Sequence, residues 1–297
     1  MYEAWAAGLA GMLRSLREDS GSAGAGPDSD HGARVDLEGG GYLLRPALTA
    51  WGRDVPLAAE LYYHPVTDST NTRLKALLAG GAGAGTVVVA GAQTAGRGRH
   101  GRDWFSPPDG GLYVSLLLRP RAALDRPGWV TLGTALALVR AGTAQGIPLG
   151  IKWPNDVLCR GRKTAGILVE AGSDERRMNW LIIGTGINLY WTVPVPPEVA
   201  AGATTLESCA GRRIDPDRLM ADFLQELWEL TLEVLSGEDR GPPAWAGEVE
   251  AHLTHFDRPV TVRTGQGEVS GRTVGLSAEG WLLLDGGRRI MTGELVQ

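Results

Sequence analysis

The chain has 297 residues, of which 43% are hydrophobic, and it carries a formal net charge of −5. That length and apolar content suffice for a large core and more than one domain, while the acidic balance argues against a protein whose main role is to hold a nucleic-acid backbone. No apolar run is long enough to span a bilayer and the first residues lack a signal-peptide pattern, so we expect a soluble, cytoplasmic enzyme. The two cysteines, Cys159 and Cys209, are too few for a disulfide scaffold or a zinc site.

The first 56 residues predict a separate N-terminal unit. Residues 4–17 carry an apolar stripe at helical spacing, residues 19–32 are rich in glycine, serine and aspartate and predict a mobile loop, and residues 35–44 alternate around a glycine turn as a β-hairpin does. A helix followed by a hairpin is typical of the second half of a winged helix-turn-helix. The two helices that would complete such a unit have no room before Ala4, so we interpret residues 1–56 as a truncated winged-helix remnant and do not expect DNA binding.

Residues 57–256 predict an α+β domain built on a mixed sheet that is flanked by helices. Short β-branched or apolar runs predict the strands, and longer segments of helical periodicity predict the helices. The expected strands cover residues 61–63, 86–90, 112–118, 165–170 and 179–189, and the expected helices begin near residues 70, 129, 215 and 244. From residue 257 the pattern changes to short alternating strands with a turn at Asp285-Gly286, which predicts a small C-terminal β-barrel domain over residues 257–297.

The helix near residue 70 begins with four polar residues, Asp68, Ser69, Thr70 and Asn71. Such residues cap the free N–H groups of a first helical turn, but one cap requires only one of them. The others either belong to the same cap or turn their hydroxyl and amide groups toward a ligand.

Glycine alternates with arginine in residues 91–107, GAQTAGRGRHGRDWFSP, which follow the strand at residues 86–90. Glycine lets a backbone approach a ligand closely, and arginine presents N–H groups that suit carboxylate and phosphate oxygens. An aromatic pair, Trp104 and Phe105, ends the segment. The pattern predicts a loop that closes over an anionic, partly aromatic ligand and is mobile without it; the alternatives are a flexible basic loop and an arginine–glycine segment that binds nucleic acid.

Two later segments place polar residues at irregular strand positions. In IKWPNDV, Pro154 cannot donate to a strand ladder and keeps the preceding residue extended, so the neighbouring polar residues lie where a strand ends; a surface turn is the alternative. In residues 179–189, two glycines inside a strand indicate that a ligand or another backbone segment approaches closely. The polar residues are Lys152, Asn155 and Asp156, the glycines are Gly184 and Gly186, and Asn188 follows as a candidate polar contact.

Four segments, GRGRHGRDWFSP, KWPNDV, KTAGILVE and GTGINL, occur in the order and at the approximate spacing found in biotin–protein ligases, and the chain resembles that family from about residue 57 to its C-terminus. The resemblance implies the α+β fold of class II aminoacyl-tRNA synthetases and biotin ligases, with a small β-barrel tail. It also implies a two-step reaction. Biotin and MgATP first give biotinyl-5′-AMP and pyrophosphate; a lysine of a biotin carboxyl carrier protein, a subunit of acetyl-CoA carboxylase, then takes the biotinyl group and releases AMP.

The residue types suit this chemistry, because a carboxylate and an α-phosphate must be brought together and positive charge lowers their repulsion. The resemblance implies that the catalytic residues are Lys163, Arg97, Arg99 and Asp156, with Asp156 orienting the acceptor lysine or taking its proton. It implies biotin contacts from Ser69, Thr70, Asn71, Gln93, Arg97, Gly98, Arg99, Lys163, Gly166 and Gly186. It implies ATP or adenylate contacts from Arg99, Arg102, Trp104, Lys152, Asn155, Lys163 and Asn188. Mg²⁺ would bridge the phosphates with few protein ligands, so no metal-binding side chains are expected, and the family suggests a homodimer through an exposed sheet edge.

Three alternatives remain at this point. Lipoate–protein ligases and octanoyltransferases share the implied fold and attach a different acid to a similar carrier lysine. The transferase would need a nucleophilic cysteine, for which Cys159 is the candidate, although a structural role is favoured for it. A biotin-responsive DNA-binding repressor depends on the N-terminal remnant alone, whereas the glycine–arginine segment and KWPND favour a biotin ligase.

Overall fold

The computed structural model describes residues 33–36, 42–45, 60–120, 126–174, 177–236 and 241–296. The helix expected at residues 4–17 and the loop expected at residues 19–32 lie outside these ranges. Within the described ranges, no helix is long and apolar enough to cross a membrane.

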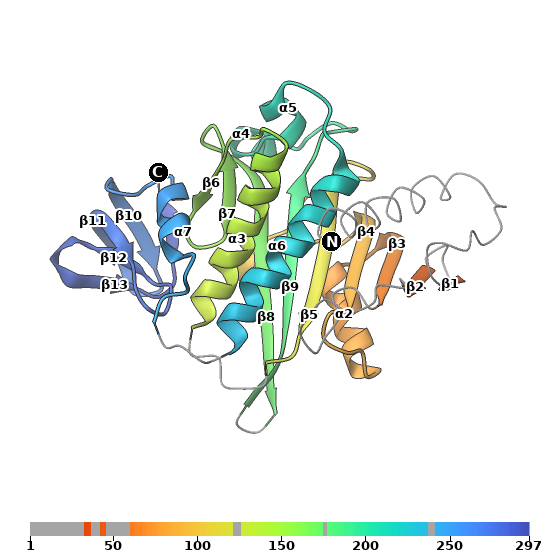
Figure 1. The fold of residues 1–297 in the computed structure, drawn as a ribbon. Coiled ribbons are helices and arrows are strands. Elements are labelled where there is room, and N and C mark those ends of the chain that lie inside the picture. The colour runs from red at the N-terminus through yellow and green to blue at the C-terminus, as the bar shows by residue number, and fades with distance from the viewer. Residues whose placement is uncertain are drawn as a thin grey trace.

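A nine-stranded mixed sheet forms the centre of the main domain (Figure 1). Its order is β1-β2-β3-β4-β5-β9-β8-β7-β6, and every neighbouring pair is antiparallel except β3 and β4. The strands are β1 (Ala33–Asp36), β2 (Tyr42–Arg45), β3 (Leu61–Thr67), β4 (Val87–Gln93), β5 (Gly111–Leu118), β6 (Leu149–Lys152), β7 (Asp156–Cys159), β8 (Arg162–Asp174) and β9 (Arg177–Asn188). The predicted α+β class with a mixed sheet is confirmed.

The hairpin expected within residues 35–44 is part of this sheet. Strands β1 and β2 pair with each other, and β2 also pairs with β3, with Tyr42 opposite Tyr63 and Leu44 opposite Leu61. Strand pairing therefore crosses the boundary that was expected at residue 57. The physical reason is that β3 would otherwise leave a row of N–H and C=O groups unpaired at the sheet edge, which β2 satisfies.

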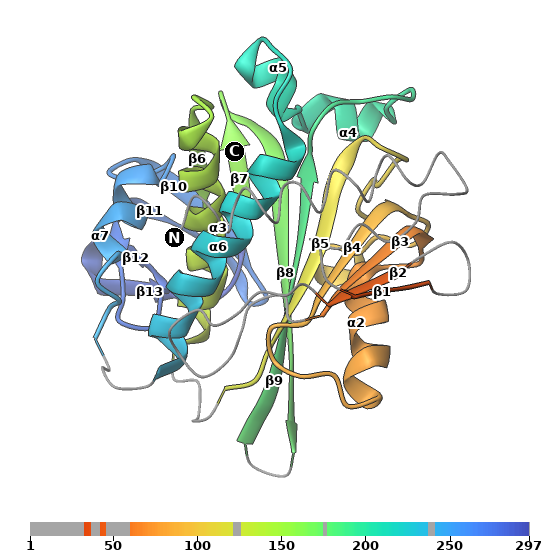
Figure 2. The same cartoon turned by 45° about the vertical axis from the view of Figure 1, so that its right-hand side comes forward.

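Helices cover both faces of the sheet (Figures 1 and 2). Alternate residues of a strand belong to different faces. On one face, α3 (Pro127–Ala144) and α6 (Pro216–Ser236) pack over the larger core, which takes in Val87 and Val89 of β4. On the other face, α2 (Thr70–Ala79) places Leu74 against Val88. This alternation follows from the two-residue period of a strand. Because α2 covers only part of its face, the rest of that face is open for a site.

The C-terminal residues form a five-stranded antiparallel sheet in the order β13-β12-β11-β10-β14. Its strands are β10 (Pro259–Thr264), β11 (Gly267–Leu276), β12 (Leu282–Leu284), β13 (Arg288–Ile290) and β14 (Glu294–Val296), and α7 (Ala246–His252) precedes them. The predicted small β domain is thus confirmed, with one strand, β14, that the sequence analysis did not expect. Two tryptophans fix it to the main domain, since the indole N–H of Trp129 donates to Ala278 O at 2.9 Å and that of Trp153 to Gly280 O at 3.3 Å.

Candidate active site

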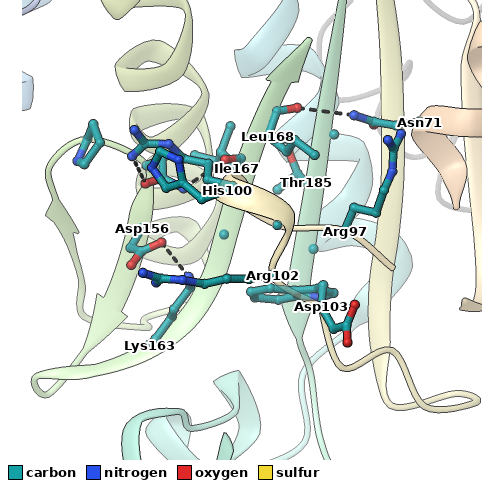
Figure 3. A pocket seen from close by; sticks show the side chains of 18 of the residues that line it. Asn71, Arg97, His100, Arg102, Asp103, Asp156, Lys163, Ile167, Leu168 and Thr185 are labelled. Atoms are coloured by element: carbon teal, nitrogen blue, oxygen red, sulfur yellow. Dashed lines mark hydrogen bonds and ion pairs between the residues drawn. The ribbon is translucent and has the colours of Figure 1, made fainter. Parts of the chain in front are cut away.

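A cavity with about 920 Å³ of open space lies on the sheet face that α2 only partly covers. Its walls come from the start of α2, strands β8 and β9, the turn around Pro154 and the end of the C-terminal sheet. Residues 96–104, which we call the glycine–arginine loop, complete it. Figure 3 shows Asn71 and Arg97 at one end of this cavity and Asp156 and Lys163 at the other. Segments that are far apart in the sequence therefore converge here, and the two ends can be described in turn.

Asn71 is held at the first end by groups from three strands. Its Nδ2 donates to Glu170 Oε2 at 2.8 Å, and the Ser115 hydroxyl donates to its Oδ1 at 2.6 Å. The side chain lies over Gly184, where a Cβ atom would be 2.2 Å from Asn71 Oδ1. The close approach that was predicted at this strand glycine is thus made by a neighbouring side chain, and any larger residue at position 184 would displace it.

Thr70 and Gln93 form a second bonded pair at the same end. Gln93 Oε1 accepts a hydrogen bond from the backbone N–H of Thr70 at 2.9 Å, and its Nε2 donates to the Ser106 hydroxyl at 2.9 Å. Ser69, the N-cap residue of α2, makes no side-chain capping hydrogen bond and lines the cavity. Because Gln93 satisfies a free N–H group of the first turn, the Ser69 hydroxyl has no capping role and can serve a ligand.

The glycine–arginine loop folds back on itself across the cavity. The Gly98 N–H donates to Arg102 O at 2.7 Å, and the Trp104 N–H donates to Gly96 O at 2.9 Å. A Cβ atom at Gly96 would lie 2.6 Å from Trp104 O, so this position needs glycine. At the tip, His100 has a φ of 58°, in the left-handed region that few side chains adopt.

Two arginines attach this loop to the turn around Pro154 and to the C-terminal sheet. Arg99 donates from Nη1 to Asn155 Oδ1 at 3.0 Å and from Nη2 to Thr292 Oγ1 at 3.0 Å. Arg102 donates from Nη1 to Glu294 Oε1 at 2.7 Å. The hydrogen bonds from Arg102, followed by its charge, lower the pKa of Glu294 to about 2 against the opposing effect of burial. The carboxylate is therefore ionised at neutral pH, and the loop is closed over the cavity.

Trp104 lies on a pair of glycines at the centre of the site. A Cβ atom at Gly186 would be 2.3 Å from Trp104 Nε1, and one at Gly166 would be 2.8 Å from Trp104 Cζ3. These glycines face each other across β8 and β9. The indole N–H is buried without a hydrogen-bond partner among the described residues. The ammonium group of Lys163 lies 5.2 Å from the ring centroid, so the ring has a cation beside it.

Lys163 and Asp156 form an ion pair at the second end, with Nζ and Oδ1 2.6 Å apart. Here the first cavity meets a second one that extends toward α4 (Pro197–Gly202). The residues that line both cavities are Asp103, Trp104, Lys152, Asp156, Lys163 and Leu295. A ligand with two parts can therefore occupy both cavities and place its junction beside Lys163.

The predicted contact residues come together with one exception. All of them line the first cavity except Asn188, which lines the second and donates from Nδ2 to Thr204 O at 3.2 Å. Sequence reasoning missed Ser115, Glu170, Thr292 and Glu294. Two signals were available among these: a serine inside the apolar run of β5, and the glutamate that ends the KTAGILVE segment. In the part of the chain that the structure describes, no three His, Cys, Asp or Glu side chains gather closely enough to hold a metal ion.

Cys159, the candidate nucleophile of an octanoyltransferase, is bonded to another cysteine. Cys159 forms a disulfide with Cys209 of α5 (Leu206–Ala210), with the Cα atoms 6.4 Å apart, and it is 1% exposed. It lines neither cavity. A buried, oxidised sulfur cannot attack an acyl group, so the geometry argues against acyl transfer through Cys159.

Comparison with known proteins agrees with this geometry. Two family models match the chain, the Biotin/lipoate A/B protein ligase family over residues 63–188 and the Biotin protein ligase C terminal domain over residues 255–295. The biotin–[acetyl-CoA-carboxylase] ligase of Paracoccus denitrificans is 35% identical, over 76% of this chain and 95% of its own length. The bifunctional ligase/repressor BirA of Bacillus subtilis is 36% identical, over 77% of this chain and 70% of its own length. The biotin protein ligase from Aquifex aeolicus in complex with biotin and ATP is 32% identical with a TM-score of 0.68, over 80% of this chain and 97% of that one.

The mixed sheet, the cavity on one face and the appended small β-sheet together define a ligase of the biotin and lipoate class. Within that class the chain belongs to the biotin protein ligase family, because both family models and relatives more than 30% identical agree.

Proposed function

We propose that this chain is a biotin–protein ligase that activates biotin with ATP to biotinyl-5′-AMP and transfers the biotinyl group to a lysine of a biotin carboxyl carrier protein. The observation that carries the proposal is the meeting of two cavities at Lys163, Asp156 and Trp104. Adenylation requires an organic acid and a nucleotide to meet at one point in a fixed orientation. Relatives named as biotin–[acetyl-CoA-carboxylase] ligases support both the acid and the carrier.

The first end of the cavity suits the ureido ring of biotin. That ring presents one carbonyl acceptor and two N–H donors in a plane, and it needs partners that can both donate and accept. The hydroxyls of Ser69 and Thr70 have this property, and the Asn71 amide beside them is fixed by the protein. Arg97 and Gly98 of the glycine–arginine loop close this end.

In the first step, a carboxylate oxygen of biotin forms a bond to the α-phosphorus of ATP, and the bond from that phosphorus to the β-phosphate oxygen breaks. Pyrophosphate leaves with the electron pair. Lys163, Lys152 and Arg99 line the first cavity and lower the repulsion between the two anions. Trp104, which lines both cavities, offers its ring to the adenylate. Mg²⁺ would enter as part of the substrate MgATP, with ligands mainly from phosphate and water.

In the second step, the ε-amine of the carrier lysine attacks the carbonyl carbon of the mixed anhydride, and AMP leaves. An ordinary lysine, with a pKa of about 10.4, must first lose a proton. We assign Asp156 to orient that amine or accept its proton, because its carboxylate already holds one ammonium group, that of Lys163, at 2.6 Å.

The proposal also covers the oligomeric state and the cellular location. Edge strand β6 is bridged at Ile151 to Leu253, so a homodimer through a sheet edge would use the β1 side. The enzyme would act in the cytoplasm on a carrier subunit of acetyl-CoA carboxylase. The repressor role in the name of the Bacillus relative is not extended to this chain, because the hairpin that would supply a wing belongs to the main sheet.

Pyrophosphate exchange into ATP tests the proposal, with biotin, lipoate and octanoate supplied separately. Exchange with biotin alone is expected; exchange with lipoate would transfer the chain to the lipoate ligases, and no exchange with any acid would contradict adenylation. Preformed biotinyl-5′-AMP then isolates the second step. Asp156→Asn is expected to slow biotin transfer to the carrier at least about 10-fold, and an unchanged rate would remove Asp156 from that role.

A further inference from the structure

Glu170, the last residue of the KTAGILVE segment, joins three parts of the site. It lies on β8, on the same face of the sheet as Gly166 and Leu168. Its carboxylate is contacted by Asn71 Nδ2 at 2.8 Å, by Lys75 Nζ at 2.7 Å and by Arg97 Nη2 at 3.2 Å. Two of these donors come from α2 and the third from the glycine–arginine loop. A single acidic group therefore connects the helix that begins at the biotin end with the loop that closes over it.

The first consequence concerns the orientation of the Asn71 amide. A carboxylate can only accept hydrogen bonds, so the NH₂ group of Asn71 must face Glu170. The oxygen of the amide then faces Ser115, whose hydroxyl donates to it at 2.6 Å. The Ser115 hydroxyl also lies 2.8 Å from the hydroxyl of Thr70, which lines the cavity. The orientation of the Asn71 amide therefore also affects the hydrogen bonding of Thr70. The Leu168 carbonyl also accepts from Asn71 Nδ2, but at 3.5 Å (Figure 3). Glu170, at 2.8 Å, is therefore the nearer and stronger of the two acceptor-only partners that set the amide orientation.

The second consequence concerns the loop. Arg97 is the first arginine of the glycine–arginine loop, and its backbone pairs with Asp103 where the loop returns. An ion pair between its guanidinium and Glu170 therefore ties the base of the loop to β8. Burial opposes ionisation of Glu170, but hydrogen bonds from Lys75 and Asn71 and the charge of Arg97 lower its pKa below the usual value. The ion pair between Arg97 and Glu170 is therefore present at neutral pH.

We propose that Glu170 is a positioning residue: its carboxylate orients Asn71 for the acid substrate and holds Arg97 so that the loop stays closed over the same end. The identity of the acid as biotin rests on the proposed function, whereas the effect of Glu170 on the glycine–arginine loop does not. Binding of the acid and closure of the loop thereby depend on one carboxylate, so both are lost when that carboxylate is removed.

Glu170→Gln tests the inference, because it keeps the shape but removes the charge and adds a donor. The KM for biotin is expected to rise about 10-fold or more, and the KM for ATP less than about two-fold, because charge-assisted hydrogen bonds are lost only at the biotin end. Trypsin is expected to cleave the unliganded variant within residues 97–102 several-fold faster than the wild type. A general loss of structure would move both KM values and the melting temperature together.

Glu226→Gln is the matched control. Glu226 on α6 is similarly shielded, with 19% of its side chain exposed against 20% for Glu170, and it makes an ion pair with Arg140 at 2.8 Å away from both cavities. This variant is expected to keep the wild-type KM for biotin and the wild-type cleavage rate. If Glu170→Gln matches it in both measurements, the inference is overturned. If the wild type itself shows no biotin-dependent exchange, the proposed function fails, while trypsin cleavage still decides whether Glu170 holds the loop.

Discussion

The two ends of the active-site cavity are built in different ways. At the first end, where we propose that biotin binds, Thr70 and Asn71 are 4% and 3% exposed, and their side chains are hydrogen-bonded to residues of the main sheet. At the second end, where we propose that the nucleotide binds, the glycine–arginine loop reaches across to the C-terminal sheet through Arg102 and Glu294, whose side chains are 62% and 43% exposed. One end is thus formed by a single packed unit, and the other by contact between a loop and another domain.

The difference has an energetic meaning. Buried hydrogen bonds are costly to break because the separated groups stay away from water, whereas exposed ion pairs contribute only about 0–1 kcal/mol. The biotin end should therefore keep its geometry without ligand, while the loop contacts to the C-terminal sheet can open at little cost. Defects at the first end should appear as weaker binding of the acid, and defects at the second as weaker binding of ATP or premature release of the adenylate.

The largest expected effect comes from Lys163, at the second end of the first cavity, where the two cavities meet. Lys163→Met should lower biotin-dependent pyrophosphate exchange at least about 100-fold, because a charge aimed at the reacting anions is lost. Lys163→Arg should lower it less, about 10-fold, since the charge remains but the planar fork replaces a compact ammonium group. Only three of the 29 lysines and arginines are lysines, and two of them line this cavity, which suggests that the ammonium group is needed here.

The control for Lys163 is Arg263→Met, which removes a cation from an ion pair with Glu268 on the C-terminal sheet, where 60% of the arginine side chain is exposed. The Arg263→Met variant should leave biotin-dependent pyrophosphate exchange unchanged. Exchange by Lys163→Met within about three-fold of the wild type would show that this ammonium group does not serve the first step.

Alanine substitutions at two glycines of β9 should affect the two ends of the cavity separately, because each adds one methyl group beside a different side chain. Gly184→Ala would press on Asn71, 2.2 Å from the new Cβ, and should raise the KM for biotin about 10-fold or more. Gly186→Ala would press on Trp104, 2.3 Å away, and should raise the KM for ATP by a similar factor with a smaller effect on biotin.

Gly247→Ala on α7 is the control for this pair, because no atom lies within 4 Å of its Cβ position and alanine favours a helix. Steady-state kinetics with each substrate varied in turn measures the effects. If both strand variants changed the two KM values equally, the ends would not be separable, and the contrast between them would be wrong.

Much of this arrangement could be predicted from the sequence, and the part that could not has a common cause. Ser69, Gln93 and Lys163 belong to motifs whose residue types indicate their chemistry, so they were found without coordinates. Ser115 and Glu170 were not predicted as site residues, because their roles depend on which strands become neighbours. Strand β5 pairs with β9, and β9 pairs with β8. Strand order is not encoded in any local pattern.

The C-terminal contacts illustrate the same limit over a longer range. Glu294 belongs to a strand of only three residues, too short for an alternating pattern to be recognised. Its partner, Arg102, is 192 positions earlier in the chain. The hairpin at residues 33–45 is the converse case, since its local pattern was recognised but its attachment to β3 was not.

The last expected effect is on stability and not on catalysis, and it involves two buried histidines outside the lining of the active-site cavity. His64 lies on β3 before α2, and His255 lies near Lys152; both are 7% exposed. Burial lowers the pKa of each from 6.5 to about 4, with help from the charges of Arg73 and Lys152 respectively. Between these pH values the unfolded chain binds more protons than the folded one, so the free energy of unfolding must fall as the pH is lowered from about 6.5 to about 4.

Each histidine should account for at most about 3 kcal/mol of that fall. Urea unfolding at several pH values between about 5 and 7 measures it, a range above the pKa of the carboxylates that are paired in the fold. His64→Gln and His255→Gln should each flatten the pH dependence without abolishing it, whatever their effect at pH 7. A slope that neither variant changes would mean that both rings are already protonated in the fold or stay solvated, and the domain junction beside Lys152 would then be more open than its burial indicates.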